Sequence, residues 1–159
     1  GRPLSEAIRT LQQRHPQYHN EIRLYYDEWT TMLGGPIEHN VALLKPLKSN
    51  YRLFGLTNWS AETFPIAYDL YAFFKEFEGI VVSGEVKLAK PDERIYQLLL
   101  QQFGLIAAEC LFIDDNKRNI LAALELGFET IHLDSGVSLK EELGKRQISA
   151  VIPEQNSII

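Results

Sequence analysis

The sequence predicts an α/β domain built on a parallel sheet, preceded by a smaller helical part. From residue 51 onward, short apolar runs alternate with amphipathic stretches, which is the pattern of strand–helix–strand units. Residues 4–33 instead carry apolar side chains at spacings of three and four, which is the helical period. Gly34-Gly35-Pro36 separates the two patterns. We therefore expect a partial helical unit over 1–36, an α/β core over 37–147 and a tail over 148–159.

The composition excludes several classes of protein. The chain has 159 residues, which suits one domain with a small appendage. Its formal net charge of −5 argues against nucleic-acid binding, which needs a clustered basic surface. A single cysteine cannot form an internal disulfide, so we expect a reducing, cytoplasmic setting. No apolar run approaches the ~20 residues of a membrane-spanning helix, so no membrane contact is expected.

The helical part is predicted as two helices, over about 4–11 and 20–33, with a break at His15-Pro16. The core is expected to begin with a third helix over 37–47. Its strands are predicted over 51–56, 80–82, 110–113 and 128–133. Four further helices are predicted between and after these strands. They run through 64–74 with Ser60 as cap, from Pro91 to Phe103, through 120–124 and over 137–143.

Three polar segments follow the predicted strands. They are Thr57-Asn58, Lys90-Pro91 and Asp114-Asp115-Asn116. In an open α/β sheet, ligands bind beyond the carboxyl ends of the strands. Each segment alone has an ordinary explanation: a turn, an exposed loop lysine or a helix cap. Together they offer hydrogen-bond donors for an anion, a cation to neutralise it and two carboxylates for Mg²⁺, which is what phosphoryl transfer requires.

The segments also resemble a known family. Leu56-Thr57-Asn58-Trp59-Ser60, Ser83-Gly84-Glu85 through Lys90-Pro91-Asp92, and Phe112-Ile113-Asp114-Asp115-Asn116 resemble motifs II, III and IV of the haloacid dehalogenase superfamily. The resemblance covers roughly residues 36–143. It implies a Rossmann-like core, and it implies that the helical part is most of a small cap that closes over the substrate.

The same resemblance implies roles for individual residues. Thr57 and Asn58 would hold the transferred phosphoryl group, and Lys90 would neutralise its charge. Asp114 and Asp115 would hold Mg²⁺. We also expect Trp59 to contact the substrate, because it directly follows the anion-binding pair.

One family feature is absent from this sequence. Members of the family begin with a strand that ends in Asp-x-Asp or Asp-x-Gly, whose first Asp is the covalent nucleophile, and this chain has no such strand. Asp134-Ser135-Gly136 imitates it, but we expect a turn there. We therefore expect the nucleophile strand to lie outside this sequence, at an incomplete amino end. The chain would then associate with its own missing segment or with a second copy. A less favoured alternative is that the tail around 148–152 fills the gap.

The predicted function is a Mg²⁺-dependent phosphatase that acts on a small phosphorylated metabolite through an aspartyl-phosphate. Two alternatives stay open. A 2-haloacid dehalogenase resembles the chain in cap and fold, but its chemistry needs no metal and its fourth motif typically lacks the acidic pair Asp114-Asp115. A non-catalytic binding protein would lack the nucleophile and still retain the other site residues.

Overall fold

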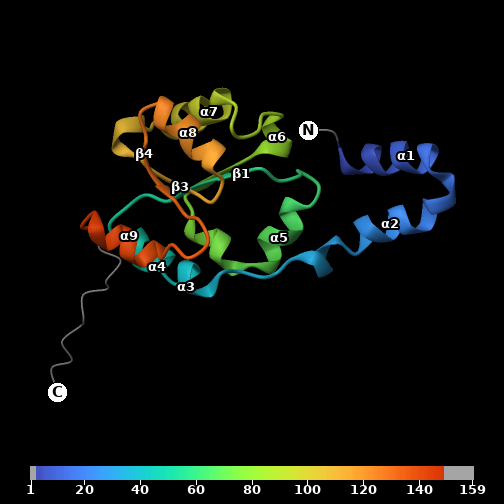
Figure 1. Cartoon of the computed structure of the whole chain (residues 1–159), viewed down its shortest axis with the longest axis horizontal. Coiled ribbons are helices and arrows are strands. Elements are labelled where there is room, and N and C mark those ends of the chain that lie inside the picture. Colours follow the sequence, from blue (N-terminus) through green and yellow to red (C-terminus); the bar gives the residue numbers. More distant parts are fainter. Residues whose placement is uncertain (1–2, 149–159) are drawn as a thin grey trace, which may run out of the picture.

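The computed structural model describes residues 3–148, which contain four short strands, nine α-helices and four short 3₁₀ helices (Figure 1). The strands are β1 (Phe54–Thr57), β2 (Gly79–Val82), β3 (Leu111–Asp114) and β4 (Glu129–His132). The helices are α1 (Leu4–Arg14), α2 (His19–Asp27), α3 (Glu38–Val41), α4 (Leu44–Lys48), α5 (Phe64–Leu70), α6 (Ser83–Val86), α7 (Glu93–Phe103), α8 (Lys117–Glu125) and α9 (Leu139–Lys145). The α/β class with parallel strands is confirmed.

The strands form two separate parallel pairs among the described residues. β1 pairs with β2, so that Thr57 lies opposite Val82. β3 pairs with β4, so that Asp114 lies opposite His132. In each pair the two strands end in register, and the residues that follow them therefore emerge at a common edge.

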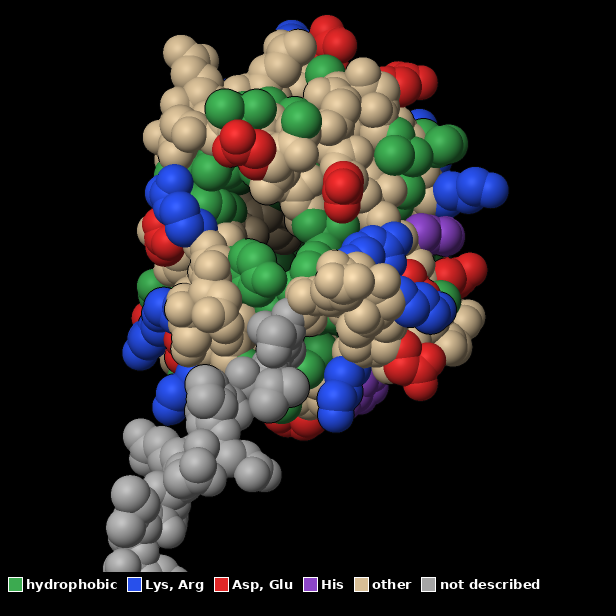
Figure 2. All heavy atoms as spheres, turned by 90° about the vertical axis from the view of Figure 1, so that its left-hand side faces the viewer, with side chains coloured by type: hydrophobic (Ala, Val, Ile, Leu, Met, Phe, Trp, Pro, Cys, Tyr) green, Lys and Arg blue, Asp and Glu red, His purple; other side chains and the backbone are tan. Residues whose placement is uncertain are grey.

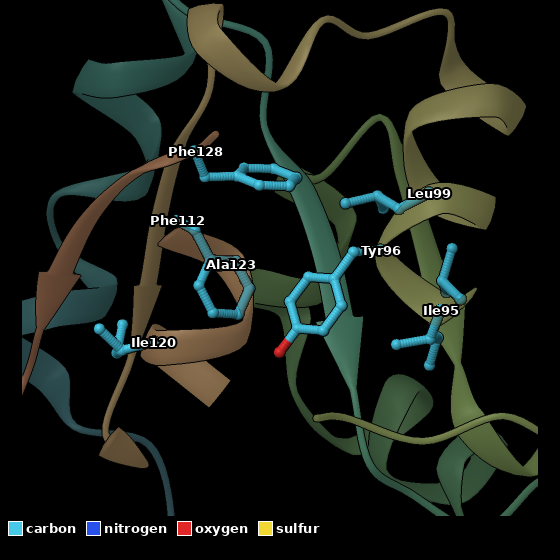
Figure 3. Packing of buried hydrophobic residues seen from close by; sticks show 8 residues of the cluster. Ile95, Tyr96, Leu99, Phe112, Ile120, Ala123 and Phe128 are labelled. Atoms are coloured by element: carbon cyan, nitrogen blue, oxygen red, sulfur yellow. The ribbon is translucent and has the colours of Figure 1, made fainter. Parts of the chain in front are cut away.

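Two hydrophobic clusters lie on the two faces of the strands. The first contains Tyr96 and Leu99 of α7, Ile120 and Ala123 of α8, and Phe112 of β3 (Figure 3). The second gathers residues of α4, α9 and β4, namely Leu47, Leu139, Leu143 and Ile131, together with Leu43. Leu111 and Ile113 of β3 pack against this second cluster, because successive side chains of a strand point to opposite faces.

β1 is incompletely covered, and one face of the core is hollowed (Figure 2). All four residues of β1 are only half-buried, whereas strands of parallel sheets are ordinarily covered on both faces. Figure 2 shows a hollow in the core, between the part that carries α7 and α8 and the part that carries α4 and α9. Hydrophobic side chains lie around this hollow.

Helices α1 and α2 form a hairpin at one end of the molecule (Figure 1). Neither helix has a fully buried residue. The hairpin and the turn that follows it reach the core at the loop after β1: Ser5 donates its backbone N–H and its hydroxyl to the carboxylate of Glu62, and Trp29 packs edge-on against Trp59. The division of the chain at residue 36 stays a prediction, and residues 149–159 of the expected tail lie outside the described part.

Several predicted boundaries were wrong. The helix expected over 37–47 is two helices, because Pro46 has no N–H to donate to the carbonyl of Ala42. Ser60 does not cap a helix; its hydroxyl accepts the backbone N–H of Glu62 in a turn, and α5 begins only at Phe64. α7 begins after Asp92, whose carboxylate accepts the backbone N–H of Arg94.

The structure tests the expectation of a turn after β4. The stretch after β4 is a turn, as predicted: Asp134 accepts the N–H of Ser135 on its carboxylate and that of Val137 on its carbonyl, and Gly136 has a φ of +90°. Among the described residues, no helix is both long and apolar enough to cross a bilayer.

Tyr96 joins the core to the edge where the polar segments lie. Its ring is fully buried against Phe112 and Phe128, and its hydroxyl donates to the carbonyl of Asn119 at 3.0 Å. Burial, followed by the negative charge of Asp114, raises the pKa of Tyr96 to about 12.

We predict that Tyr96→Phe lowers the free energy of unfolding at pH 7 by about 1–2 kcal/mol, because the buried carbonyl of Asn119 loses its donor. The raised pKa of Tyr96 also predicts that the stability of the fold depends on pH in the alkaline range. The stability that neutral Tyr96 contributes is complete below its ordinary pKa of about 10 and is lost as the pH rises toward about 12. Urea unfolding at several pH values should therefore show a steeper alkaline loss for the wild type than for Tyr96→Phe. Tyr25→Phe, at an exposed position, is the control. Equal alkaline slopes in the wild type and Tyr96→Phe would contradict the account.

Candidate active site

A buried ion pair lies at the centre of the candidate site. The ammonium Nζ of Lys90 donates to Oδ2 of Asp114 at 2.6 Å. The two side chains are only 10% and 6% exposed, so water screens their attraction far less than at the surface. The ammonium also lies 5.7 Å from the centre of the Phe112 ring, within the range of a cation–π contact.

The other oxygen of Asp114 is held by the start of the next helix. Oδ1 accepts the backbone N–H of Asn116 at 2.8 Å and the side-chain amide of Asn119 at 2.9 Å. Asn116 caps α8, and Asn119 is a buried residue of the same helix. Three donors therefore fix the orientation of the Asp114 carboxylate.

Asn58 links the loop after β1 to the segment before α7. Its Nδ2 donates to the carbonyl of Lys90 at 2.9 Å, and its Oδ1 accepts the backbone N–H of Lys90 at 2.8 Å. Three residues proposed from the sequence, Asn58, Lys90 and Asp114, thus form one chain of direct contacts.

Two further predicted residues lie next to this chain of contacts. Thr57 is the half-buried last residue of β1 and directly precedes Asn58. Asp115 directly follows Asp114 and is exposed, and its backbone carbonyl lies 2.9 Å from Nε2 of His132. Their roles in binding stay predictions.

Trp59 lies in an aromatic cluster rather than alone at the site. Its indole N–H donates to the hydroxyl of Thr63 at 3.0 Å. Its ring packs edge-on against Phe64, Phe74 and Trp29. Contact between Trp59 and a substrate stays a prediction.

Sequence reasoning did not assign the support that Ser83 and Gly84 give to this loop. The Ser83 hydroxyl accepts the N–H of Trp59 at 2.9 Å and donates to its carbonyl at 3.1 Å. The backbone N–H of Gly84 donates to the same carbonyl at 2.9 Å. A Ser-Gly pair directly after the second strand is the sequence signal, but it does not reveal which loop the pair contacts.

Asp114 and Asp115 are the residues that could hold a metal. Mg²⁺ binds oxygen ligands and commonly takes one or two carboxylates while keeping several waters, so this pair fits its chemistry. Within residues 3–148 no cluster of three or more His, Cys, Asp or Glu side chains is present that could form a metal site by itself. Further ligands would have to be water, substrate or a group from outside the described part.

The close approach at Gly84 leads to a prediction about the loop that carries Thr57 and Asn58. A Cβ at Gly84 would collide with the backbone N of Ala61 and lie 2.8 Å from the Trp59 carbonyl. We expect Gly84→Ala to lower the free energy of unfolding by about 1–3 kcal/mol. The control is Gly144→Ala on α9, where nothing lies within 4 Å of the added Cβ. It should stay within about 1 kcal/mol of the wild type, on the stabilising side. Equal urea midpoints for both variants would show that the approach at Gly84 is not tight.

The chain has clear relatives among known proteins. It is 30% identical over 125 residues to a sesquiterpene phosphatase from Aspergillus oryzae, covering 78% of this chain and 63% of that protein. It is 23% identical over 164 residues to a phosphoglycolate phosphatase from Photobacterium profundum, covering all of this chain and 72% of that protein.

The chain is also similar to a solved structure of the same family. A haloacid dehalogenase family enzyme from Bacteroides thetaiotaomicron, in complex with magnesium and inorganic phosphate, superimposes with a TM-score of 0.59 at 27% identity. The match covers 67% of this chain and 57% of that one, so the chain spans less than two thirds of this structure and of the sesquiterpene phosphatase. The sequence model of haloacid dehalogenase-like hydrolases matches residues 1–133, and the chain therefore belongs to that family.

Proposed function

We propose that this chain carries the binding half of a Mg²⁺-dependent phosphatase that acts on a small phosphorylated metabolite. The observation that carries the proposal is the buried Lys90–Asp114 pair, which Asn58 ties to the end of β1. In this proposal the ammonium of Lys90, the hydroxyl of Thr57 and the carboxylates of Asp114 and Asp115 act together at one edge of the strands. Two relatives of the chain are phosphatases, and a structural neighbour binds inorganic phosphate, which supports the reaction class.

Each residue has a distinct part in this proposal. The hydroxyl of Thr57 donates a hydrogen bond to a phosphoryl oxygen, and the ammonium of Lys90 neutralises charge on the phosphoryl group and on its attacker. Asp114 and Asp115 hold Mg²⁺. When bound, the metal supplies further neutralisation of the phosphoryl oxygens.

The attacking group in this proposal is an aspartate outside the sequence. Its carboxylate oxygen forms a bond to phosphorus as the ester P–O bond breaks, and the leaving alkoxide takes a proton from solvent. Water then attacks the phosphorus of the aspartyl-phosphate, which releases inorganic phosphate and restores the carboxylate. We place this aspartate at the end of a strand between β1 and β3. The half-buried β1 and the separation of the strands into two pairs support that placement, because such a strand would end between Thr57 and Asp114.

The metal assignment is tested by Asp115→Asn in the polypeptide as its natural gene produces it. We expect Mg²⁺-dependent hydrolysis of a generic phosphoester to fall by roughly 100-fold or more, because the substitution removes a charged ligand. Asp69→Asn, at an exposed residue of α5, is the matched control and should retain full activity.

Three results would argue against the phosphatase. Full hydrolysis by Asp115→Asn with magnesium chelated would remove the metal from the reaction. Halide release from a 2-haloacid without metal would favour the dehalogenase instead. A natural polypeptide of 18.2 kDa that binds phosphate and never turns over would be a binding protein.

A further inference from the structure

The side chain of Asn58 is occupied by the main chain of Lys90. An asparagine amide offers an acceptor oxygen and two N–H donors. In this structure the oxygen takes the backbone N–H of Lys90 and one N–H goes to its carbonyl, at 2.8 and 2.9 Å. The amide thus makes a reciprocal pair of hydrogen bonds with one residue 32 positions along the chain.

The main chain at Lys90 lies outside helix and strand. It falls between α6 and α7, in a turn closed by the N–H of Asp92 donating to the carbonyl of Ala89. The next residue is Pro91, which has no N–H to contribute. The amide of Asn58 therefore provides hydrogen bonds that regular secondary structure would provide elsewhere.

The position of the Lys90 ammonium depends on the position of the Lys90 main chain. The four-carbon stem has several rotatable bonds, and ordering it costs about 2 kcal/mol of conformational entropy. Lys90 is held at both ends, by Asn58 at its main chain and by Asp114 at its ammonium. Because Asn58 follows Thr57, the same two hydrogen bonds also tie the main chain at the end of β1 to that of Lys90.

We propose that Asn58 is a positioning residue that holds the main chain of Lys90, so that the ammonium stays on Asp114, rather than a ligand of the phosphoryl group. The value of this to catalysis rests on the proposed function. The positioning itself does not, and it is measurable without turnover.

The test measures how fast each lysine amine reacts with a water-soluble acetylating reagent, by mass spectrometry of peptides from the intact chain. In the wild type, Lys90 should react more slowly than exposed Lys140, because its ammonium is 10% exposed and paired. In Asn58→Ala, Lys90 should react about three- to tenfold faster, the change that loss of one or two hydrogen bonds produces. The rate at exposed Lys140 should not change, which shows that the reagent acts equally on both proteins. The urea midpoint of Asn58→Ala, measured alongside, reports any general loosening of the fold.

Two further variants test whether the effect on Lys90 comes from the hydrogen bonds of Asn58. Asn58→Asp keeps an acceptor for the Lys90 N–H and loses the donor to its carbonyl, so its rate at Lys90 should lie between those of the wild type and Asn58→Ala. Asn50→Ala removes the same group from an exposed position after α4 and should leave Lys90 unchanged. Because the Asp variant retains the shape of the side chain, it serves if the Ala variant unfolds.

An unchanged rate at Lys90 in Asn58→Ala and Asn58→Asp would overturn the proposal, as would a wild-type Lys90 that reacts as fast as Lys140. Added inorganic phosphate separates this from the proposed function. Phosphate that fails to protect Lys90 in the wild type, in the presence of Mg²⁺, would count against the phosphoryl site, while the rates measured without phosphate would still decide the role of Asn58.

Discussion

The contact between Lys90 and Asp114 is the interaction on which the site depends. Asp114 ends β3, and Lys90 is tied through Asn58 to the end of β1, so the ion pair bridges the two strand pairs at their carboxyl edge. The pair is buried, and removal of either partner would leave an uncompensated charge in a poorly solvated place. One set of contacts therefore closes the edge of the fold and assembles the proposed phosphoryl site.

The hydrophobic core supports this edge through a polar connection that begins at Tyr96. Tyr96 is anchored in the first cluster by Phe112 and Phe128, and its hydroxyl holds the carbonyl of Asn119. The side chain of Asn119 in turn holds Asp114. The packing of α7 against α8 therefore helps to fix the orientation of the Asp114 carboxylate. Tyr96, Asn119 and Asp114 are all buried, so water does not compete for these hydrogen bonds.

The two strand pairs differ from a complete sheet in a way that bears on catalysis. A parallel strand with one neighbour leaves half of its backbone groups unpaired on the other side. β1 and β3 each have one neighbour among the described residues, and β1 is half-buried throughout. A strand between them would satisfy these groups, cover β1 and bring a further side chain to the edge between Thr57 and Asp114. One additional strand would therefore both stabilise β1 and β3 and carry the proposed attacking aspartate.

Local patterns in the sequence determined the class of the fold and predicted the residues of the candidate site. Alternating strand and helix periods predicted the parallel α/β core. The segments at Thr57 and Asp114 lie at the ends of β1 and β3, as predicted, whereas Lys90 lies between α6 and α7 and not directly after a strand. Helix boundaries were less predictable, since the break at Pro46 and the turn at Ser60 depend on which backbone groups find partners. Only the tertiary structure decided what each polar group binds. The amide of Asn58 takes the main chain of Lys90, 32 residues away, and the ammonium of Lys90 takes Asp114, 24 residues away. Periodicity shows which residues reach an edge, but the partner of a hydrogen bond is set by distances that exist only after the strands have packed.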